Sequence, residues 1–356
     1  MDREIKELSK NAFDVLRSVQ PDGSWVSDGE IKNTVLKISE NLQECLNLAQ
    51  VKLSEICDQT DDVADNNVKT RDLIVSWHDG KDRFCSPSMI AYVVGAFGFD
   101  YKAHRSLIDA MLVASVLAEV NNDMPYHNNL HFRKVLLHLV RMLTIHNRLF
   151  KDKVLDQESV AKLVVAACIH DLGHNGGSNI VDRKYHMARL EKASYTLAYP
   201  FLAKTGVSED FLNDILLMLI GTDTAPFGDP ISPSSQIKVA YEYHYSIKGQ
   251  GGLSLSEELM RLERDQQLAL LCVILHEADI MNSAGVDYDI TKYETVCVSQ
   301  EYGDTGAYPE DTLLFLEKVC NGGFLTDAGS YLADDNLKTI KGRIMQDFKN
   351  GNKSYV

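Results

Sequence analysis

Hydrophobic residues recur along most of this chain at the three-to-four-residue spacing of an amphipathic helix. In the segment 28–60, for example, Ile31, Val35, Ile38 and Leu42 share one helical face. Strictly alternating patterns, which are typical of strands, are rare, and glycine and proline stand between the periodic segments rather than within them. We therefore predict an all-α fold, with helices over residues 3–20, 28–60, 106–120, 131–150, 158–170, 185–205, 210–221 and 256–280.

The pattern changes near residue 60. The stretch DQTDDVADNN at residues 58–67 is acidic and polar, and we interpret it as a linker. Apolar residues are denser after it. We expect a helical N-terminal region at residues 1–65 and one compact multi-helix main domain at residues 66–350. This boundary is soft, because the N-terminal helices could pack onto the domain.

Composition and charge exclude several kinds of partner. The chain is 45% hydrophobic and 24% charged, the balance of a globular, core-forming protein. It has 36 basic and 51 acidic residues, and this net charge of −15 argues against a nucleic acid polymer as partner. No uninterrupted apolar stretch approaches the ~20 residues that a membrane span requires. Neither the composition nor the hydrophobic pattern of the sequence indicates an oligomeric state.

The number and spacing of the cysteines indicate the redox state of the compartment in which the protein is found. The seven residues form no CxxC pair, and Cys168 and Cys272 lie inside apolar runs, where a free thiol behaves as a small hydrophobe. Their number is odd, and the charged beginning MDREIKELSK has no features of a secretory signal. We therefore expect a reducing compartment and a cytoplasmic location.

Two apolar helical segments end in carboxylates and imidazoles. LVVAACI at residues 163–169 is followed by His170 and Asp171, and LALLCVIL at 268–275 is followed by HEAD, which ends at Asp279. An unpaired buried carboxylate is costly, so a cation is expected to compensate it. Imidazole with carboxylate is a suitable ligand set for zinc, manganese or iron.

Two more motifs add histidines. YHNNLH at residues 126–131 places His127 and His131 on one face of a helix. HDLGHNGGSN at residues 170–179 places His174 one turn after His170, and its glycine pair ends the helix. The same spacings occur in ordinary amphipathic helices, so either histidine pair alone decides little. Together with the later Asp279, they predict a metal site.

In order along the chain, YHNNLH, HDLGHNGGSN, Thr222-Asp223 and HEADIMN at residues 276–282 resemble the signature segments of class I cyclic nucleotide phosphodiesterases. Those enzymes are the all-helical members of the HD superfamily of metal-dependent phosphohydrolases, and the resemblance spans about residues 90–330. It implies hydrolysis of a 3′,5′-cyclic nucleotide, cAMP or cGMP, to the 5′-monophosphate by a hydroxide that two metal ions activate. Zinc is implied at the tighter site and magnesium or manganese at the second.

The resemblance also implies roles for individual residues. The side chains that would bind metal, with Asp171 bridging two ions, are His131, His170, Asp171 and Asp279. His127 would be the general acid that protonates the leaving oxygen. The groups that would orient these ligands and the second ion's waters are His174, Glu191, Thr222 and Asp223. The residues that would line the nucleotide pocket are Tyr126, Asn282, Phe315, Asn321 and Phe324.

The sequence departs from the family pattern near two of these motifs. After His131, the bulky Phe132 stands where the family usually has a small residue, and Lys134 stands in place of an aspartate. The family's ENHH segment appears as EKAS at residues 191–194, which keeps only Glu191.

A third departure concerns the base. The family reads it with a glutamine three residues before a stacking phenylalanine, and the counterparts here are Thr312 before Phe315 or Asn321 before Phe324. Two alternatives therefore stay open. The chain could be an HD-type phosphohydrolase of another nucleotide or phosphodiester, or a non-catalytic metal-binding interaction module. Retention of all the metal-binding residues and of His127 argues against the second alternative.

Overall fold

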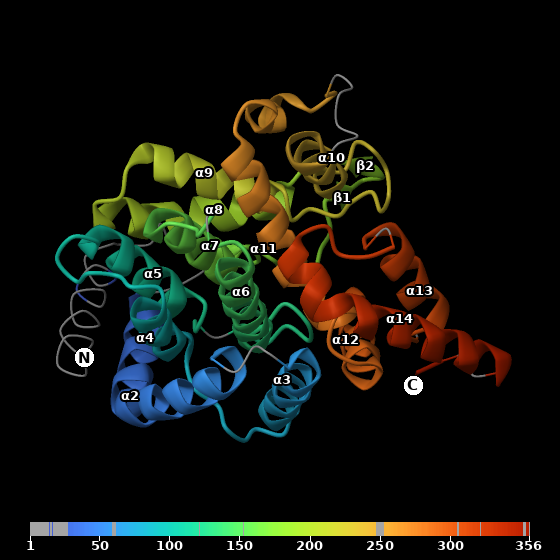
Figure 1. The fold of residues 1–356 in the computed structure, drawn as a ribbon, viewed down its shortest axis with the longest axis horizontal. Helices are drawn as coiled ribbons and strands as arrows, with labels where there is room; N and C mark the ends of the chain where they lie inside the picture. The colour runs from blue at the N-terminus through green and yellow to red at the C-terminus, as the bar shows by residue number, and fades with distance from the viewer. Residues whose placement is uncertain are drawn as a thin grey trace.

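Helices form almost all of the regular structure in a computed structural model of this chain (Figure 1). The described residues are 14, 16, 28–58, 62–120, 122–151, 153–246, 253–304, 306–320, 322–351 and 354–355. The helices are α2 Asp28–Cys57, α3 Val63–His78, α4 Ser86–Ala96, α5 Arg105–Leu117, α6 Asn129–Leu149, α7 Gln157–Ile169, α8 Arg189–Leu202, α9 Glu209–Ile220, α10 Pro233–Tyr245, α11 Gln266–Ala284, α12 Tyr288–Tyr302, α13 Pro309–Lys318 and α14 Asp327–Lys349. Two 3₁₀ helices, η1 Ala203–Thr205 and η2 Glu257–Glu263, and one antiparallel hairpin, β1 Ile180–Val181 with β2 Lys184–Tyr185, complete the regular structure of the described residues. The all-α prediction is confirmed.

Helix α11 lies at the centre of the fold (Figure 1). It packs against α6, α7, α9, α10, α12 and α14. Because it is covered on so many sides, it is apolar around most of its circumference, as Leu271, Val273 and Ile274 illustrate. Within the described ranges, no single helix is long and apolar enough to cross a membrane, and only α11 together with α12, bent by 101°, meets those criteria as a pair.

Polar caps decide where the helices that carry the predicted site residues begin. The side chain of Asn128 accepts hydrogen bonds from the N–H groups of Leu130 and His131 and so starts α6. Asp156 and Asp265 start α7 and α11 in the same way. These caps place His131 in the first turn of α6.

Some predicted boundaries are wrong. The segment 256–280 is not one helix, because the cap at Asp265 separates η2 from α11. The segment 185–205 begins as strand β2, and α8 starts only after Ala188, whose φ is +51°. Pro200 lies inside α8, contrary to the expectation that proline stands between helices. The linker predicted at 58–67 is already helical from Val63, because Asp62 caps α3.

The described part of the N-terminal region packs on the main domain. Helix α2 contacts α3, α4, α5 and α6, and its Leu46 and Leu53 belong to the common core. The predicted helix over residues 3–20 lies mostly outside the described residues. The domain boundary at residue 65 stays a prediction.

Candidate active site

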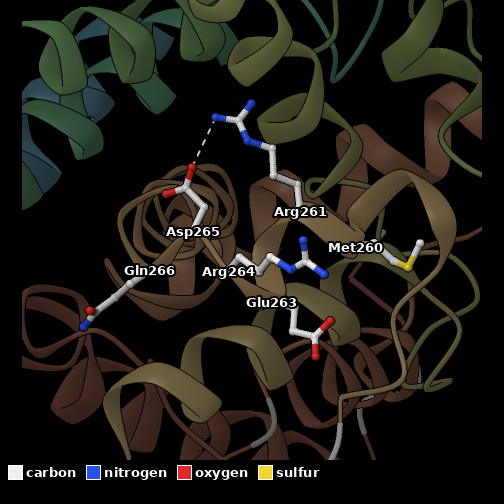
Figure 2. Close-up of a pocket in the computed structure, with 6 residues that line it drawn as sticks. All are labelled: Met260, Arg261, Glu263, Arg264, Asp265 and Gln266. Carbon is white, nitrogen blue, oxygen red and sulfur yellow. Dashed lines mark hydrogen bonds and ion pairs between the residues drawn. The ribbon is translucent and has the colours of Figure 1, made fainter.

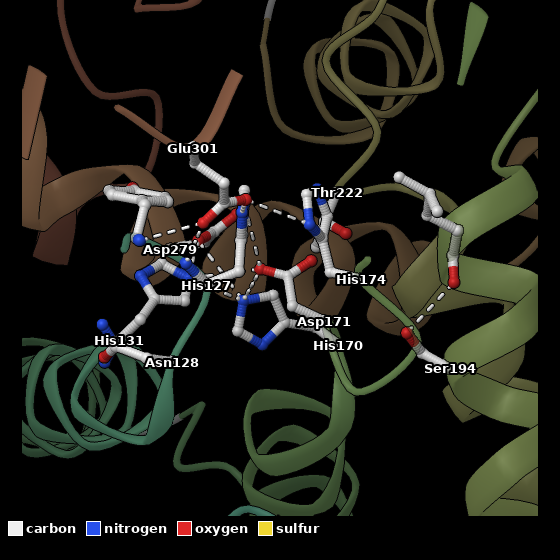
Figure 3. A network of polar contacts seen from close by, with 12 residues as sticks. His127, Asn128, His131, His170, Asp171, His174, Ser194, Thr222, Asp279 and Glu301 are labelled. Carbon is white, nitrogen blue, oxygen red and sulfur yellow. Dashed lines mark hydrogen bonds and ion pairs between the residues drawn. The ribbon is translucent and has the colours of Figure 1, made fainter. Parts of the chain in front are cut away.

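Four side chains from three parts of the chain converge on one point (Figure 3). His131 lies on α6, His170 and Asp171 directly follow α7, and Asp279 lies on α11. His131 Nε2 and His170 Nε2 are 3.1 Å apart. Asp171 Oδ2 is 3.3 Å from His131 Nε2 and 2.9 Å from His170 Nε2, and Asp279 Oδ1 is 3.3 and 3.5 Å from the same two atoms.

This arrangement has the size of a metal-ligand shell. An ion that binds nitrogen and oxygen at about 2.0–2.2 Å holds neighbouring ligand atoms roughly 2.8–3.6 Å apart, for octahedral or tetrahedral geometry. The five measured separations between the four ligand atoms fall close to that range, and all four atoms lie within 4.8 Å of one another. The residues therefore fit a divalent cation.

Hydrogen bonding and charge prepare the imidazole of His170 for this role. His170 Nδ1 donates to the carbonyl oxygen of Ala167 at 2.9 Å, which leaves Nε2 with a lone pair for a cation. His131 and His170 are 0% and 1% exposed. Although burial alone would lower the pKa of His170, the charges of Asp171 and Asp279 hold that pKa well above its ordinary value. The cluster therefore attracts positive charge.

His127 lies beside this cluster. Its Nδ1 is 2.5 Å from Glu301 Oε1, and its Nε2 is 3.7 Å from Asp171 Oδ2. Glu301 Oε2 accepts hydrogen bonds from the N–H groups of Tyr126 at 2.9 Å and His127 at 3.0 Å. Burial lowers the pKa of His127, while Asp171 and Glu301 oppose that effect. The ring thus has one nitrogen fixed by Glu301 and the other turned toward the ligand cluster.

His174 joins the same group. Its ring stacks on His127 with centroids 3.5 Å apart, and its Nδ1 lies 3.2 Å from Glu301 Oε1. Ligand atoms of His127, His174 and Glu301 lie within 4.8 Å of one another, so this trio is a second candidate cation site by distance. Because two backbone N–H groups already occupy Glu301 Oε2, we interpret the trio as a hydrogen-bonded support for His127.

Glu301 was not predicted from the sequence. It lies near the end of α12 with a side chain only 1% exposed, and its partner His127 is 174 positions away. A glutamate in the polar segment SQEYGD carries no local signal of such a role.

The glycines of HDLGHNGGSN shape the turn that delivers Asp171. A Cβ on Gly173 would lie 2.8 Å from the backbone nitrogen of Ser194 in α8, so only glycine lets the turn pack this closely. The Gly173 N–H donates to Ser194 Oγ at 2.8 Å. Gly176 has a φ of +74°, in the left-handed region that glycine adopts at little cost. The serine of EKAS therefore anchors this turn.

Glu191 is a buried carboxylate close to the cluster. Its two oxygens lie 3.3 and 3.0 Å from Asn179 Nδ2, which donates to them. Burial, and then the charges of Asp223 and Asp171, raise the pKa of Glu191 to about 8. Burial and the neighbouring carboxylates therefore favour the protonated form of Glu191, and a cation bound nearby would favour its ionised form.

Thr222 and Asp223 are held by their own surroundings. Asp223 Oδ2 accepts from Tyr185 Oη at 2.7 Å and from the N–H of Ala188 at 2.9 Å. Thr222 Oγ1 donates to the carbonyl of Leu219 at 2.8 Å. These contacts tie the hairpin and the start of α8 to the end of α9.

The predicted pocket residues lie in different surroundings in the structure. The ring of Tyr126 lies 4.7 Å from that of His127 and is part of the cluster. Asn282 is instead 0% exposed, with Oδ1 3.5 Å from His138 Nε2. Its Nδ2 has no hydrogen-bond partner among the described residues. Asn321 lies outside them.

The two phenylalanine candidates differ in exposure. Phe315 is half-buried, and its ring meets that of the exposed Phe227 at 6.1 Å between centroids. Phe324 is only 8% exposed and belongs to the core. Thr312, the residue that would replace the family's glutamine before Phe315, is buried and lies 3.0 Å from Thr295 Oγ1.

A separate hollow lies at the other end of α11 (Figure 2). The residues that line it are Met260, Arg261, Glu263, Arg264, Asp265 and Gln266. Asp265 precedes Asp279 by 14 positions, a separation of about 21 Å along a helix. Arg261 and Asp265 form an ion pair there at 3.1 Å, and none of the predicted site residues is present.

Comparison with known proteins finds similarity only to solved structures. No family model matches the chain, and no curated protein matches it. The fold is similar to that of the phosphodiesterase domain of the RhoPDE fusion protein from the choanoflagellate Salpingoeca rosetta, with 18% identity over 83% of this chain and 95% of that chain and a TM-score of 0.44. A second similar structure is the phosphodiesterase domain of Salpingoeca rosetta rhodopsin phosphodiesterase. It has 19% identity over 82% of this chain and 92% of that chain, with a TM-score of 0.43. At this level of similarity, the roles of the site residues rest on the geometry of the site.

Proposed function

We propose that this protein is a metal-dependent phosphodiesterase that hydrolyses a 3′,5′-cyclic nucleotide to the 5′-monophosphate. One arrangement carries the proposal: four ligand atoms converge within 4.8 Å, and an imidazole held by Glu301 points at them. Two imidazoles with two carboxylates are a ligand set for a metal, and an adjacent histidine is a suitable proton donor.

The metal-binding residues would be His131, His170, Asp171 and Asp279, with zinc suited to this set of nitrogen and oxygen donors. A magnesium or manganese ion would be the second metal, beside Asp171, and its charge would favour the ionised form of the buried Glu191. Bound divalent ions supply charge neutralisation of a phosphodiester anion and a water of lowered pKa placed for in-line attack.

His127 and Glu301 would control the proton that the leaving oxygen receives. The short contact to Glu301 holds Nδ1 of His127, so the transferable proton is on Nε2, 3.7 Å from Asp171 Oδ2. A phosphodiester bound at the ligand cluster would present its leaving 3′ oxygen to this proton. Burial lowers the pKa of His127, which makes the proton easier to transfer.

The base would meet an aromatic wall rather than an amide. The half-buried Phe315 with the exposed Phe227 offers a face on which a base can stack. Asn282, by contrast, is turned into the core against His138. This burial also favours a second candidate function, the hydrolysis of a different phosphodiester, because the pocket would lack a side-chain amide that reads cAMP or cGMP.

A substrate panel tests both functions. Purified protein with Mn²⁺ or Mg²⁺ would be incubated with cyclic mononucleotides, cyclic dinucleotides and aryl phosphodiesters, with chelator as control. Metal-dependent release of a 5′-monophosphate from cAMP or cGMP supports the proposal. Cleavage of only the other phosphodiesters supports the second candidate. Stoichiometric metal without hydrolysis of any substrate would contradict both and indicate an interaction module.

A further inference from the structure

The two phenylalanines of the proposed base site belong to different parts of the fold. Phe227 lies in the loop between α9 and α10, and Phe315 lies on α13. Their rings meet edge to face, with centroids 6.1 Å apart and an angle of 82° between the ring planes. Helix α10 packs on α11 and η2, whereas α13 packs on α12 and α14. The relative position of the two rings therefore depends on the contacts that cross from the α10 side to α13.

Lys238 makes one of these contacts. It lies on α10, is partly buried, and its Nζ donates a hydrogen bond to the carbonyl oxygen of Val319. Val319 is the C-cap residue of α13, and its N–H donates to the carbonyl oxygen of Phe315 at 2.8 Å. The ammonium of Lys238 is thus bound to the end of α13, one turn beyond the phenylalanine whose ring would stack on a base.

The end of α13 is a favourable place for this ammonium. The last carbonyl groups of a helix have no partner within the helix and carry partial negative charge, so a cation beside them is stabilised. Burial lowers the pKa of Lys238, while Cys320 and Glu277 oppose that effect. Because partial burial of an ammonium costs free energy unless it is hydrogen-bonded, the bond to Val319 should hold the lysine in one position.

The loop before α10 crosses to the same turn of α13. Gly228 has a φ of +69°, and a Cβ there would lie 2.8 Å from Cδ of Lys318. The loop therefore passes close over the last turn of α13, with Phe227 against Phe315. These are van der Waals contacts, which tolerate sliding. The hydrogen bond of Lys238 is directional, so it adds a fixed register between α10 and α13.

We propose that Lys238 is a positioning residue for the base of the substrate: by binding the end of α13, it sets the distance between Phe227 and Phe315 and so the shape of the aromatic wall that accepts a flat heterocyclic ring. The identity of the ligand rests on the proposed function, whereas the spacing of the two rings can be measured without substrate. Within the described residues, Lys238 has no hydrogen bond or ion pair with His127 or with the four residues of the ligand cluster. Its loss should therefore spare metal binding and the chemical step.

The kinetic test uses the full chain loaded with Mn²⁺. Lys238→Met keeps the length of the side chain and removes the donor. It should raise KM for cAMP and cGMP about tenfold, within the contribution of a stacked base, and change kcat by less than about twofold. Lys238→Arg keeps a donor and should restore most of the wild-type KM. Lys338→Met, whose lysine is 75% exposed on α14, is the matched control and should behave as the wild type.

A double-mutant cycle separates positioning from general destabilisation. If Lys238 acts through the aromatic wall, Lys238→Met should add little to the KM of Phe315→Ala, because the stacking contact is already lost. Multiplicative effects of the two changes on KM would overturn the proposal, and so would a loss in Lys238→Met that falls on kcat with KM unchanged. Melting temperatures establish that each variant folds. Lys238→Gln, whose side chain is too short to reach Val319, gives the same comparison if Lys238→Met is unstable.

Fluorine NMR tests the spacing of the rings without substrate. A fluorophenylalanine in place of Phe315 reports the surroundings of that ring, and Phe227→Ala should shift its signal. Lys238→Met should shift the signal in the same direction, whereas Lys238→Arg and Lys338→Met should leave it unmoved. An unmoved signal in folded Lys238→Met would overturn the proposal, whatever the activity. A shifted signal in a protein that hydrolyses no cyclic nucleotide would support the role of Lys238 in placing the rings and count against the proposed function alone.

Discussion

Glu301 Oε1 lies 2.5 Å from Nδ1 of His127, although the two residues are 174 positions apart in the chain. The other oxygen of the same carboxylate accepts the backbone N–H groups of Tyr126 and His127. One buried side chain on α12 therefore fixes both the ring and the backbone of the histidine that faces the ligand cluster. This relationship makes the acid-base role of His127 testable apart from metal binding.

Removal of the imidazole should abolish proton donation and spare the metal. His127→Ala should bind metal stoichiometrically and lose about 10²–10⁴-fold in kcat on a cyclic nucleotide, the usual worth of general acid catalysis. It should lose far less on bis-nitrophenyl phosphate, whose leaving group departs without a proton. Steady-state kinetics on both substrates with metal analysis make the comparison, and His244→Ala, outside the site, is the matched control. Equal losses on both substrates would mean that His127 shapes the site instead.

Neutralising Glu301 should shift the basic limb of the pH–kcat profile. Glu301→Gln keeps an acceptor for His127 but removes the charge that raises the pKa of His127. A general acid is active when protonated, so activity falls as pH rises through its pKa, and this limb should shift to lower pH in the variant. A shift of one unit would reduce kcat up to about tenfold on the basic side. A lower kcat with an unmoved limb in the pH–kcat profile would argue for a purely structural role.

Loss of the central carboxylate should remove the metal. Asp171 Oδ2 lies 2.9 and 3.3 Å from the Nε2 atoms of His170 and His131, so it is a shared member of the shell. Asp171→Ala should therefore lose both bound metal and activity, measured by elemental analysis and substrate turnover. Asp335→Ala, whose side chain is 96% exposed, should change neither. Full metal content in Asp171→Ala would refute the assignment of the shell.

A buried ion pair one helical turn after His131 should give a large coupling energy in a double-mutant cycle of unfolding free energy. Lys134 Nζ is 2.6 Å from Glu294 Oε1, and the two residues are 3% and 1% exposed. Lys134→Met leaves a buried carboxylate and should cost about 3–5 kcal/mol of unfolding free energy. The double variant Lys134→Met/Glu294→Met should recover most of that loss in denaturant titrations. Additive losses would show that the two side chains act independently.

The same ion pair should make the unfolding free energy depend on pH in the acid range. Burial alone would raise the pKa of Glu294, but Lys134 lowers it from 4.5 to about 2. A carboxylate whose pKa is depressed by folding contributes stability above the unfolded value and loses that contribution as pH falls toward the folded value. Unfolding free energy should therefore fall between about pH 4.5 and pH 2, and the double variant Lys134→Met/Glu294→Met should flatten this part of the profile.

Base selectivity should be weak. With Asn282 turned into the core, cAMP and cGMP should differ by less than about 100-fold in kcat/KM, because a missing hydrogen bond is worth on the order of 1 kcal/mol. Phe315→Ala should raise KM for the nucleotide, whereas Phe324→Ala, in the core, should mainly lower the melting temperature. A strong preference for one base would reveal another base-reading residue, and an unchanged KM in Phe315→Ala would exclude stacking there.

Local pattern was sufficient to predict much of this protein. Helical periodicity predicts the all-α fold, because burial of one face repeats every three to four residues and is visible in any short window. The convergence of His131, His170, Asp171 and Asp279 could be anticipated because each lies in one of the short motifs YHNNLH, HDLGHNGGSN and HEADIMN. Their roles, and those of the other predicted site residues, remain predictions.

Tertiary structure alone decided the features that join distant segments. Glu301 acquires its role only when α12 packs beside the loop before α6, and Asn282 is buried because its side chain meets His138 across α6 and α11. The physical reason is the same in both cases: a hydrogen bond between remote residues leaves no periodic trace in the sequence, because only packing brings its two partners within reach.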